Sequence, residues 1–476
     1  MQLVAYGAQD IYLTGNPQIT FFKVVYRRHT NFSMEAIEQT VNGSDTASGS
    51  GSVTISRNGD LVHKVYVTVN NLTAGTDGNT IINNVELEIG GQRIDKQTTQ
   101  WNQIWADLST PESKADGFKC MTGACGNTNT NAVGEVHVPL NFWFCRNPGL
   151  ALPLIALQYH EVKLKCVWGA AVGKRNVIAD YIYLDTDERR RFAQVSHEYL
   201  IEQIQEQAAD TSGNFKLNFN HPVKELIWTS ASTNSYGTAL LKLNGHDRFS
   251  AKEEEYFQLR QPYDYHTSVP GQNIVLTSRP QLLATPVNLI GNVAPTGAMV
   301  AHDTADNLGA QDKIAIVKTD LKIRYRCATD PGVKVGDIVV LNYEITGDAS
   351  STASFHEVAT ISEAYVDADN EASFTVSGNA NDIEDSVAGD GSVYIVARAQ
   401  DPVSRTGSLT SKINVYSFAL KPEEHQPSGT CNFSRIDTAR LEIGTSTGMT
   451  ASDNIYAVNY NVLRIMSGMG GLAYSN

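Results

Sequence analysis

Alternation of apolar and polar residues predicts strands along most of the chain. The runs that alternate, or that are rich in β-branched residues, are Phe32 to Val41, Leu61 to Leu72, Ile82 to Ile94, Glu135 to Phe144, Leu154 to Val167 and Val177 to Leu184. A period of two is typical of strands that bury one face. Helical patterning is confined to short pieces, from Gln100 to Leu108 and from Glu112 to Lys119. The pattern therefore predicts an all-β fold.

The chain also repeats itself. Four local matches occur in the same order: 37–39 with 201–203, Leu87 with Leu241, Leu140 with Tyr416, and Tyr183 with Tyr460. The offsets are 164, 154, 276 and 277 residues, so they rise sharply after the second match. Two copies of one strand order, with a long insertion in the second copy, account for all four offsets.

This repeat predicts the domain organisation. We expect two tandem antiparallel jelly rolls of eight strands each, at 31–195 and 196–476, preceded by a segment at 1–30. The insertion is expected at 272–411, as a β-rich subdomain on a loop of the second jelly roll. It holds 18 acidic and 9 basic residues, so most of the net negative charge of the chain lies there.

The charge balance argues against direct binding of nucleic acid. The formal net charge is −14, and the basic clusters are short: Arg27-Arg28-His29 and Arg189-Arg190-Arg191. A nucleic-acid-binding chain normally has an extended basic face or tail. The six cysteines follow no disulfide or zinc spacing, and the first ten residues lack a signal pattern. We expect free thiols and a soluble protein assembled in a reducing cytoplasm.

No catalytic residue, cofactor or metal site is predicted. The densest polar constellation is a loop near the C-terminus that contains Pro422, Glu423, Glu424, His425 and Pro427. Two Glu and one His close together suit acid–base chemistry. However, the prolines restrict the backbone and the following Ser-Gly favours a turn, so we interpret the segment as a rigid contact loop.

Four Asn-x-Ser/Thr sequons are candidate glycosylation sites. They are Asn31, Asn42, Asn71 and Asn432. Sequons matter only where the protein meets a glycosylation machinery, and a chain rich in Ser, Thr and Asn contains some by chance.

Long segments of the chain resemble the major capsid proteins of nucleocytoplasmic large DNA viruses. The segments are Gly7 to Lys23, Val25 to Thr30, Pro222 to Trp228, Ser417 to Asp437 and Asn459 to Ser475. The resemblance implies a double jelly roll, a homotrimer that forms a pseudo-hexagonal capsomer, and a place in the icosahedral shell of the virion. It does not cover the insertion.

The resemblance also suggests partners. Besides its own copies and neighbouring capsomers, these would be minor capsid and penton proteins. The N-terminal segment is expected to line the inner face of the shell, anchored by Phe21, Phe22, Tyr26, Arg27 and Arg28. The alternative is that these aromatic residues pack under their own jelly roll. The insertion is expected on the outer surface, where it would contact the host surface or a glycan.

Two other kinds of protein share such a fold. One is a minor capsid or scaffold protein, which would occur in few copies per particle. The other is a jelly-roll carbohydrate-binding module, which would need aromatic and amide side chains gathered on one rim.

Overall fold

The computed structural model describes residues 7–474 apart from several gaps. The gaps are 25, 45, 47, 70–77, 124–134, 170–174, 210–212, 231–235, 271–280, 283–315, 320–321, 327–334, 336, 347–351, 367–372, 378–390, 399–404, 408 and 445–452. The described residues fall into two compact units, one within 1–99, 129–204 and 460–476 and the other within 100–128 and 205–459.

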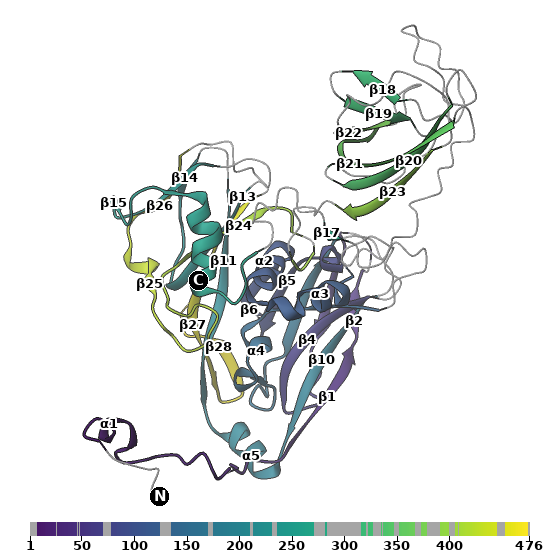
Figure 1. Ribbon diagram of the computed structural model, residues 1–476. Coiled ribbons are helices and arrows are strands. Elements are labelled where there is room, and N and C mark those ends of the chain that lie inside the picture. The colour runs from purple at the N-terminus through teal and green to yellow at the C-terminus, as the bar shows by residue number, and fades with distance from the viewer. Residues whose placement is uncertain are drawn as a thin grey trace, which may run out of the picture. The chain divides into compact units, whose positions relative to one another are not determined.

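The first jelly roll consists of two facing antiparallel sheets (Figure 1). One sheet has the order β1-β10-β4-β7, from Phe32–Gln39, Arg175–Leu184, Leu61–Val69 and Val136–Pro139, with β8 at Leu152–Pro153 beside β4. The other has the order β2-β3-β9-β5-β6, from Val41–Gly43, Ser50–Thr54, Val162–Trp168, Ile82–Ile89 and Gln92–Thr98. Alternate residues of both sheets, such as Val65 and Leu87, meet in one apolar core.

The second jelly roll repeats this arrangement. One sheet has the order β11-β27-β13-β24, from His197–Ala208, Asn454–Met466, Pro222–Ser230 and Lys412–Ser417, with β25 at Cys431–Asn432 and β28 at Met469–Leu472. The other has the order β12-β26-β14-β15, from Asn214–Lys216, Ala439–Ile443, Thr238–Leu243 and His246–Asp247, with β16 at Lys252–Glu253. Leu226 and Leu441 are among the residues that fill its core.

The sequence repeat corresponds to this structural repeat. The four matched positions fall on the strand pairs β1 and β11, β5 and β14, β7 (or the residue after it) and β24, and β10 and β27. These strands hold the same places in the two sets of sheets. The prediction of two jelly rolls is therefore confirmed.

Three of the predicted strands differ from the structure. The run from Leu154 to Val167 forms a strand only from Val162, where β9 begins, because the residues before it lie in turns. The run from Glu135 to Phe144 forms a strand only at β7, because the chain turns into helix α4 at Trp143–Arg146. The run from Ile82 to Ile94 is a hairpin, since Gly90 and Gly91 adopt positive φ angles of 59° and 85° between β5 and β6. In all three places local turn geometry overrides the alternation.

Helices are few among the described residues. They are α1 at Ile11–Thr14, α2 at Thr99–Ser109, α3 at Glu112–Met121, α4, α5 at Thr186–Gln194 and α6 at Gln261–Tyr265. Single turns occur at Gly78–Ile81, Pro148–Leu150 and Phe433–Arg435, and a π-helical segment at Tyr256–Arg260 leads into α6. Within this described part, none of the helices has the length and apolar character to cross a membrane.

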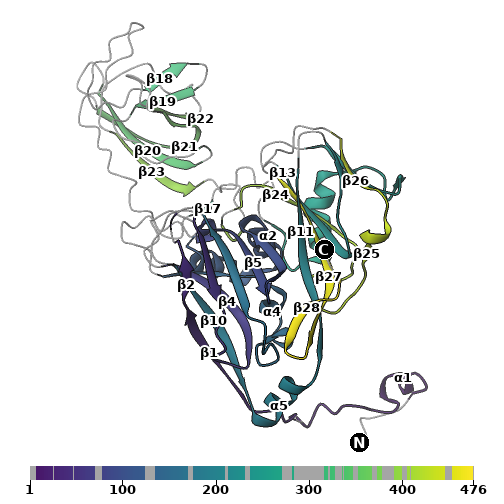
Figure 2. The same cartoon turned by 180° about the vertical axis from the view of Figure 1, so that it is seen from behind.

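The insertion contains an antiparallel sheet of its own. Its strands are β17 at Gln281–Leu282, β18 at Ile316–Thr319, β19 at Lys322–Arg326, β20 at Ile338–Thr346, β21 at Thr352–Val366, β22 at Ser373–Ser377 and β23 at Gly391–Arg398. The order is β17-β23-β20-β21-β22-β19-β18 (Figure 2). The insertion is therefore β-rich, as predicted.

Candidate functional site

The proline-containing loop, Lys421–Gly429, is closed by its own hydrogen bonds and will be called the contact loop. The amide of Lys421 donates to Ser428 Oγ at 2.9 Å, and the amide of Leu420 donates to the Ser428 carbonyl at 3.3 Å. Pro422 is buried, whereas Glu424 and Pro427 are exposed. These contacts fix the backbone of the loop while leaving part of its surface accessible.

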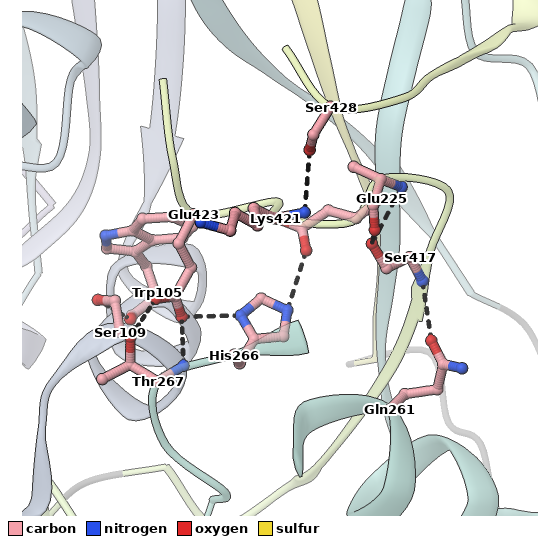
Figure 3. A network of polar contacts seen from close by, with 11 residues as sticks. Trp105, Ser109, Glu225, Gln261, His266, Thr267, Ser417, Lys421, Glu423 and Ser428 are labelled. Carbon is pink, nitrogen blue, oxygen red and sulfur yellow. Dashed lines mark hydrogen bonds and ion pairs between the residues drawn. The ribbon is translucent and has the colours of Figure 1, made fainter. Parts of the chain in front are cut away.

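Glu423 attaches the contact loop to the protein interior (Figure 3). Its carboxylate accepts hydrogen bonds from the amide of Thr267 at 3.1 Å and from the Thr267 hydroxyl. It also accepts one from His266 Nδ1 at 2.9 Å. Glu423 therefore anchors the contact loop, and its carboxylate is directed at His266 and Thr267.

His266 lies between two carboxylates. Its side chain is fully buried, with Nε2 3.0 Å from Glu225 Oε2 and Nδ1 bonded to Glu423. Burial alone lowers the pKa of His266, but Glu225 and Glu423 outweigh burial and raise that pKa to about 9. Burial would raise the pKa of Glu423, but the hydrogen bond from His266 holds that pKa below its ordinary value. His266 is therefore protonated at neutral pH, and we call the cluster of Glu225, His266 and Glu423 the histidine clasp.

Local structure explains why the histidine clasp is buried. Glu225 lies in the middle of β13, next to a register shift between Val223 and Glu225 in the pairing with β27. A β-bulge changes the direction in which side chains project. The π-helical segment and α6 pack against the neighbouring strand β24, and His266 directly follows α6. Nearly all of β13 is consequently buried, including Lys224 and Glu225.

Both ends of the insertion are held by helix α2. The amide of Ser268, before the insertion, donates to the Leu108 carbonyl at 3.0 Å. At the other end, the amide and hydroxyl of Thr406 donate to Asp107 Oδ1 at 3.2 and 2.5 Å. Arg405 joins the two ends through a 3.3 Å hydrogen bond to Ser268 Oγ. These hydrogen bonds hold both ends of the insertion close to Ser268, two positions after His266.

The first unit contains a buried polar cluster of another kind. Asp95, on β6, accepts a hydrogen bond from the amide of Ile204 at 3.1 Å and one from Gln97 Nε2 at 3.3 Å. Nearby, Arg146 pairs with Glu202 at 2.7 Å. Burial raises the pKa of Asp95 to about 7, although its hydrogen bonds and Arg146 act in the opposite direction. Neutral donors are weaker counterparts for a buried carboxylate than a protonated histidine.

The predicted inner-face anchor is exposed in this chain. The side chains of Phe21, Phe22 and Tyr26 are 86%, 98% and 79% exposed, and Arg27 and Arg28 are exposed as well. These aromatic side chains therefore do not pack under their own jelly roll. Their large apolar surface is available for a partner.

Three of the four sequons lie in the described part of the chain. Asn31, Asn42 and Asn432 are exposed, and Asn432 also caps a single turn by accepting a hydrogen bond from the amide of Ser434. Asn71 lies outside the described residues. Among the residues that the structure describes, no group of three or more His, Cys, Asp or Glu side chains is arranged to hold a metal ion.

The sequence reasoning found Glu423 but missed its partners. His266 and Glu225 lie 157 and 198 positions away from it, and nothing local to Glu423 indicates them. One signal was available: Lys224 and Glu225 interrupt the apolar strand Pro222–Ser230. A charge in such a strand needs a buried counterpart, because burying it alone is costly.

Two tandem jelly rolls with an insertion in the second define the class of double jelly-roll proteins. Family models agree: "Major capsid protein N-terminus" matches 20–179, and "Large eukaryotic DNA virus major capsid protein" matches 188–239 and 389–471. The chain belongs to this family of major capsid proteins of large eukaryotic DNA viruses.

Individual relatives support this assignment. The chain is 42% identical to the major capsid protein of Pyramimonas orientalis virus, covering 100% of this chain and 99% of the relative. A quasi-atomic model of the PBCV-1 virus capsid matches with a TM-score of 0.59 and 29% identity, covering 96% of this chain and 100% of that one. The Faustovirus major capsid protein shares the fold, with a TM-score of 0.55 and 10% identity, covering 97% of this chain and 94% of that one.

Proposed function

We propose that this chain is the major capsid protein that builds the outer icosahedral shell of a large DNA virus, with a structural and not a catalytic role. The observation that carries the proposal is the repeated sandwich, with the same strand order in both copies. Full-length similarity to a viral major capsid protein supports it. Its place is the virion, after assembly in the host cytoplasm.

The repeat also gives a mechanism for building a shell. Three chains in a closed trimer bring together six similar sandwiches, so a threefold object offers nearly sixfold edges to its neighbours. Differences between the copies set the orientation of each capsomer. Interfaces within the trimer should be large and apolar at their centres, whereas those between capsomers should be smaller and more polar.

Each remaining part of the chain has a proposed place in this assembly. The segment at 1–30 lines the inner face, where minor capsid and penton proteins are the expected partners. The insertion at 272–411 projects outward and contacts the host surface or a glycan. The exposed residues of the contact loop, Glu424 and Pro427 among them, touch a neighbouring subunit.

Purification of the recombinant chain tests the proposal. Light scattering should give a mass about three times the 51.9 kDa of one chain, and electron microscopy should show hexagonal particles with three projections. A strictly monomeric protein, or a ring of another order, would contradict the trimeric capsomer.

Surface contact is tested separately on intact particles by limited proteolysis. Cleavage should begin within 272–411. Protection of that region while strands of the two jelly rolls are cut would contradict its outer position.

A further inference from the structure

The first strands of the two jelly rolls are matched in sequence but differ in burial. Strands β1 and β11 are aligned by the sequence repeat, and each stands at the end of the strand order of its sheet. In β11 the matched residues are buried, including the charged Glu202. In β1, Phe32 and Met34 are 53% and 51% exposed, and Glu38 is exposed as well. One of the two matched strands is therefore covered, whereas the other presents its surface to solvent.

The cover of β11 comes from the first jelly roll. The amide of Ile204 donates to Asp95 Oδ1 at 3.1 Å, and Gln203 Nε2 donates to a backbone carbonyl of β6, the strand that also carries Asp95. Arg146, at the end of α4, forms an ion pair with Glu202 at 2.7 Å. All of these residues belong to the first compact unit. The beginning of the second jelly roll is therefore docked on β6 and Arg146.

The second jelly roll carries the counterparts of β6 and Arg146, and they are exposed. Strand β15 pairs with β14 after a two-residue turn, as β6 pairs with β5, and both residues of β15 are exposed. Arg146 follows Leu140 by six positions. Six positions after Tyr416, which matches Leu140, the chain is in the contact loop, where the exposed Lys421 supplies a cation. The surface that holds β11 within the chain thus recurs in the second jelly roll.

Charge complementarity favours β1 as the strand that this second surface holds. Glu38, the counterpart of Glu202, is an exposed carboxylate. Lys421 pairs with Glu424 at 2.8 Å, but both side chains are solvated, and such a pair contributes so little that Lys421 can change partner at small cost. Arg248, directly after β15, adds a second exposed cation, while the acidic residue of β15 lies 3.9 Å from a lysine of its own sheet.

We propose that β1 of one copy docks against β15 and the contact loop of a second copy, as β11 docks on β6 and Arg146 within the chain, and that Glu38 pairs there with Lys421 of that second copy. A contact that joins different surfaces of identical chains continues from copy to copy and closes into a ring when its rotation allows. Three chains joined in this way give a ring of six jelly rolls. The inference rests on the proposed function and deepens it, because it names the surfaces that join the subunits of the trimer.

Gln39 explains why the ion pair carries the contact between copies. Within the chain, Gln203 donates a hydrogen bond to β6. The matching Gln39 is occupied inside the first jelly roll, since its Oε1 accepts hydrogen bonds from the amide and the hydroxyl of Ser56 at 2.9 and 2.7 Å. Glu38 is therefore the polar residue of the matched segment that a second copy can reach.

Cross-linking through two introduced thiols tests the proximity of the two surfaces. The full-length chain with Glu38→Cys and Lys421→Cys should give covalent dimers and trimers when treated with a short bis-maleimide. The matched control is Glu38→Cys with Lys216→Cys, because Lys216 is exposed on β12, at the opposite end of the same sheet from β15. The control should give no more cross-linking than the unmodified protein, whose exposed Cys120 sets the background.

Charge reversal tests the ion pair itself. Glu38→Lys should raise the concentration at which half of the trimers dissociate about tenfold or more, since like charges placed together oppose association. Adding Lys421→Glu restores opposite signs and should return this concentration to within about threefold of the unmodified value. Sedimentation over a dilution series, in urea below the unfolding transition, measures the dissociation.

The outcomes separate this inference from the proposed function. Trimers that form normally but cross-link no more through positions 38 and 421 than through the control pair overturn the docking of β1 and leave the capsomer intact. A doubly reversed variant that dissociates as readily as Glu38→Lys also overturns the ion pair. A chain that stays monomeric overturns the proposed capsomer itself, and with it the contact between copies.

Discussion

The two buried polar clusters differ in how their charges are matched. In the histidine clasp, two carboxylates flank one imidazole, and the pKa of His266 rises to about 9 so that it is cationic at neutral pH. In the first unit, Asp95 accepts hydrogen bonds from an amide and a glutamine, and its pKa rises to about 7. The former favours the charged state, whereas the latter favours the neutral state.

The difference follows from the available counter-charge. Both groups lose water on burial, which disfavours ionisation. Two facing carboxylates compensate this loss for His266. Arg146, whose charge lowers the pKa of Asp95, already pairs with Glu202 at 2.7 Å, and its effect on Asp95 does not offset burial. The two clusters should consequently respond differently to mutation and to pH.

The largest effect is expected for Glu225→Gln. The change keeps the shape of the side chain but leaves His266 with one carboxylate fewer in a fully buried site. Removing one partner of a buried charge pair costs about 3–5 kcal/mol. Chemical denaturation should show this loss.

A half-exposed ion pair in the same unit provides the control for Glu225→Gln. Lys242 Nζ lies 2.6 Å from Glu442 Oε2. Glu442→Gln should cost less than about 1 kcal/mol, as is usual for solvated pairs. Similar losses for the two variants would refute the special role of burial in the clasp.

The second-largest effect is expected in the pH dependence of stability that the histidine clasp causes. The raised pKa of His266 means that the folded state holds its proton more tightly, so stability is lost as pH rises from about 6.5 through about 9. The lowered pKa of Glu423 means that stability is lost as pH falls below the ordinary Glu range. Melting temperature should therefore decline on both sides of neutrality, and His266→Gln should remove the alkaline decline. Persistence of that decline in the variant would assign it to other groups.

The sequence allowed the fold to be predicted better than the site. Offsets between Leu87 and Leu241, and between Tyr183 and Tyr460, depend on strand order, which repeats along the chain and needs no three-dimensional information. The histidine clasp depends on contacts between β13, the end of α6 and the contact loop, which are far apart in sequence. Strand periodicity indicates which face is buried but not which distant charge covers it.

A smaller effect is expected for Glu423→Gln, because His266 keeps Glu225. The neutral glutamine would accept weaker hydrogen bonds from Thr267 and His266 than the carboxylate does. This should lower the free energy of unfolding by about 1–3 kcal/mol and loosen the contact loop. Hydrogen exchange should rise within Lys421–Gly429. Glu424→Gln is the control within the same loop, since Glu424 forms an exposed pair with Lys421 at 2.8 Å. Equal exchange in the two variants would mean that Glu423 does not anchor the loop.

The smallest effect, and the one of opposite sign, is expected for Asp95→Asn. Because the pKa of Asp95 is raised to about 7, the folded state binds more protons than the unfolded state between about pH 4 and 7, and this residue makes stability fall as pH rises through that window. Asparagine carries no charge and its carbonyl can still accept from the amide of Ile204. The variant should therefore be at least as stable as the unmodified protein at pH 8, by a margin on the order of 1 kcal/mol, and should lose the advantage at pH 4. Denaturation at the two pH values measures both. A variant that is less stable at pH 8 would show that the carboxylate is ionised and matched in the folded protein, and the contrast with the histidine clasp would disappear.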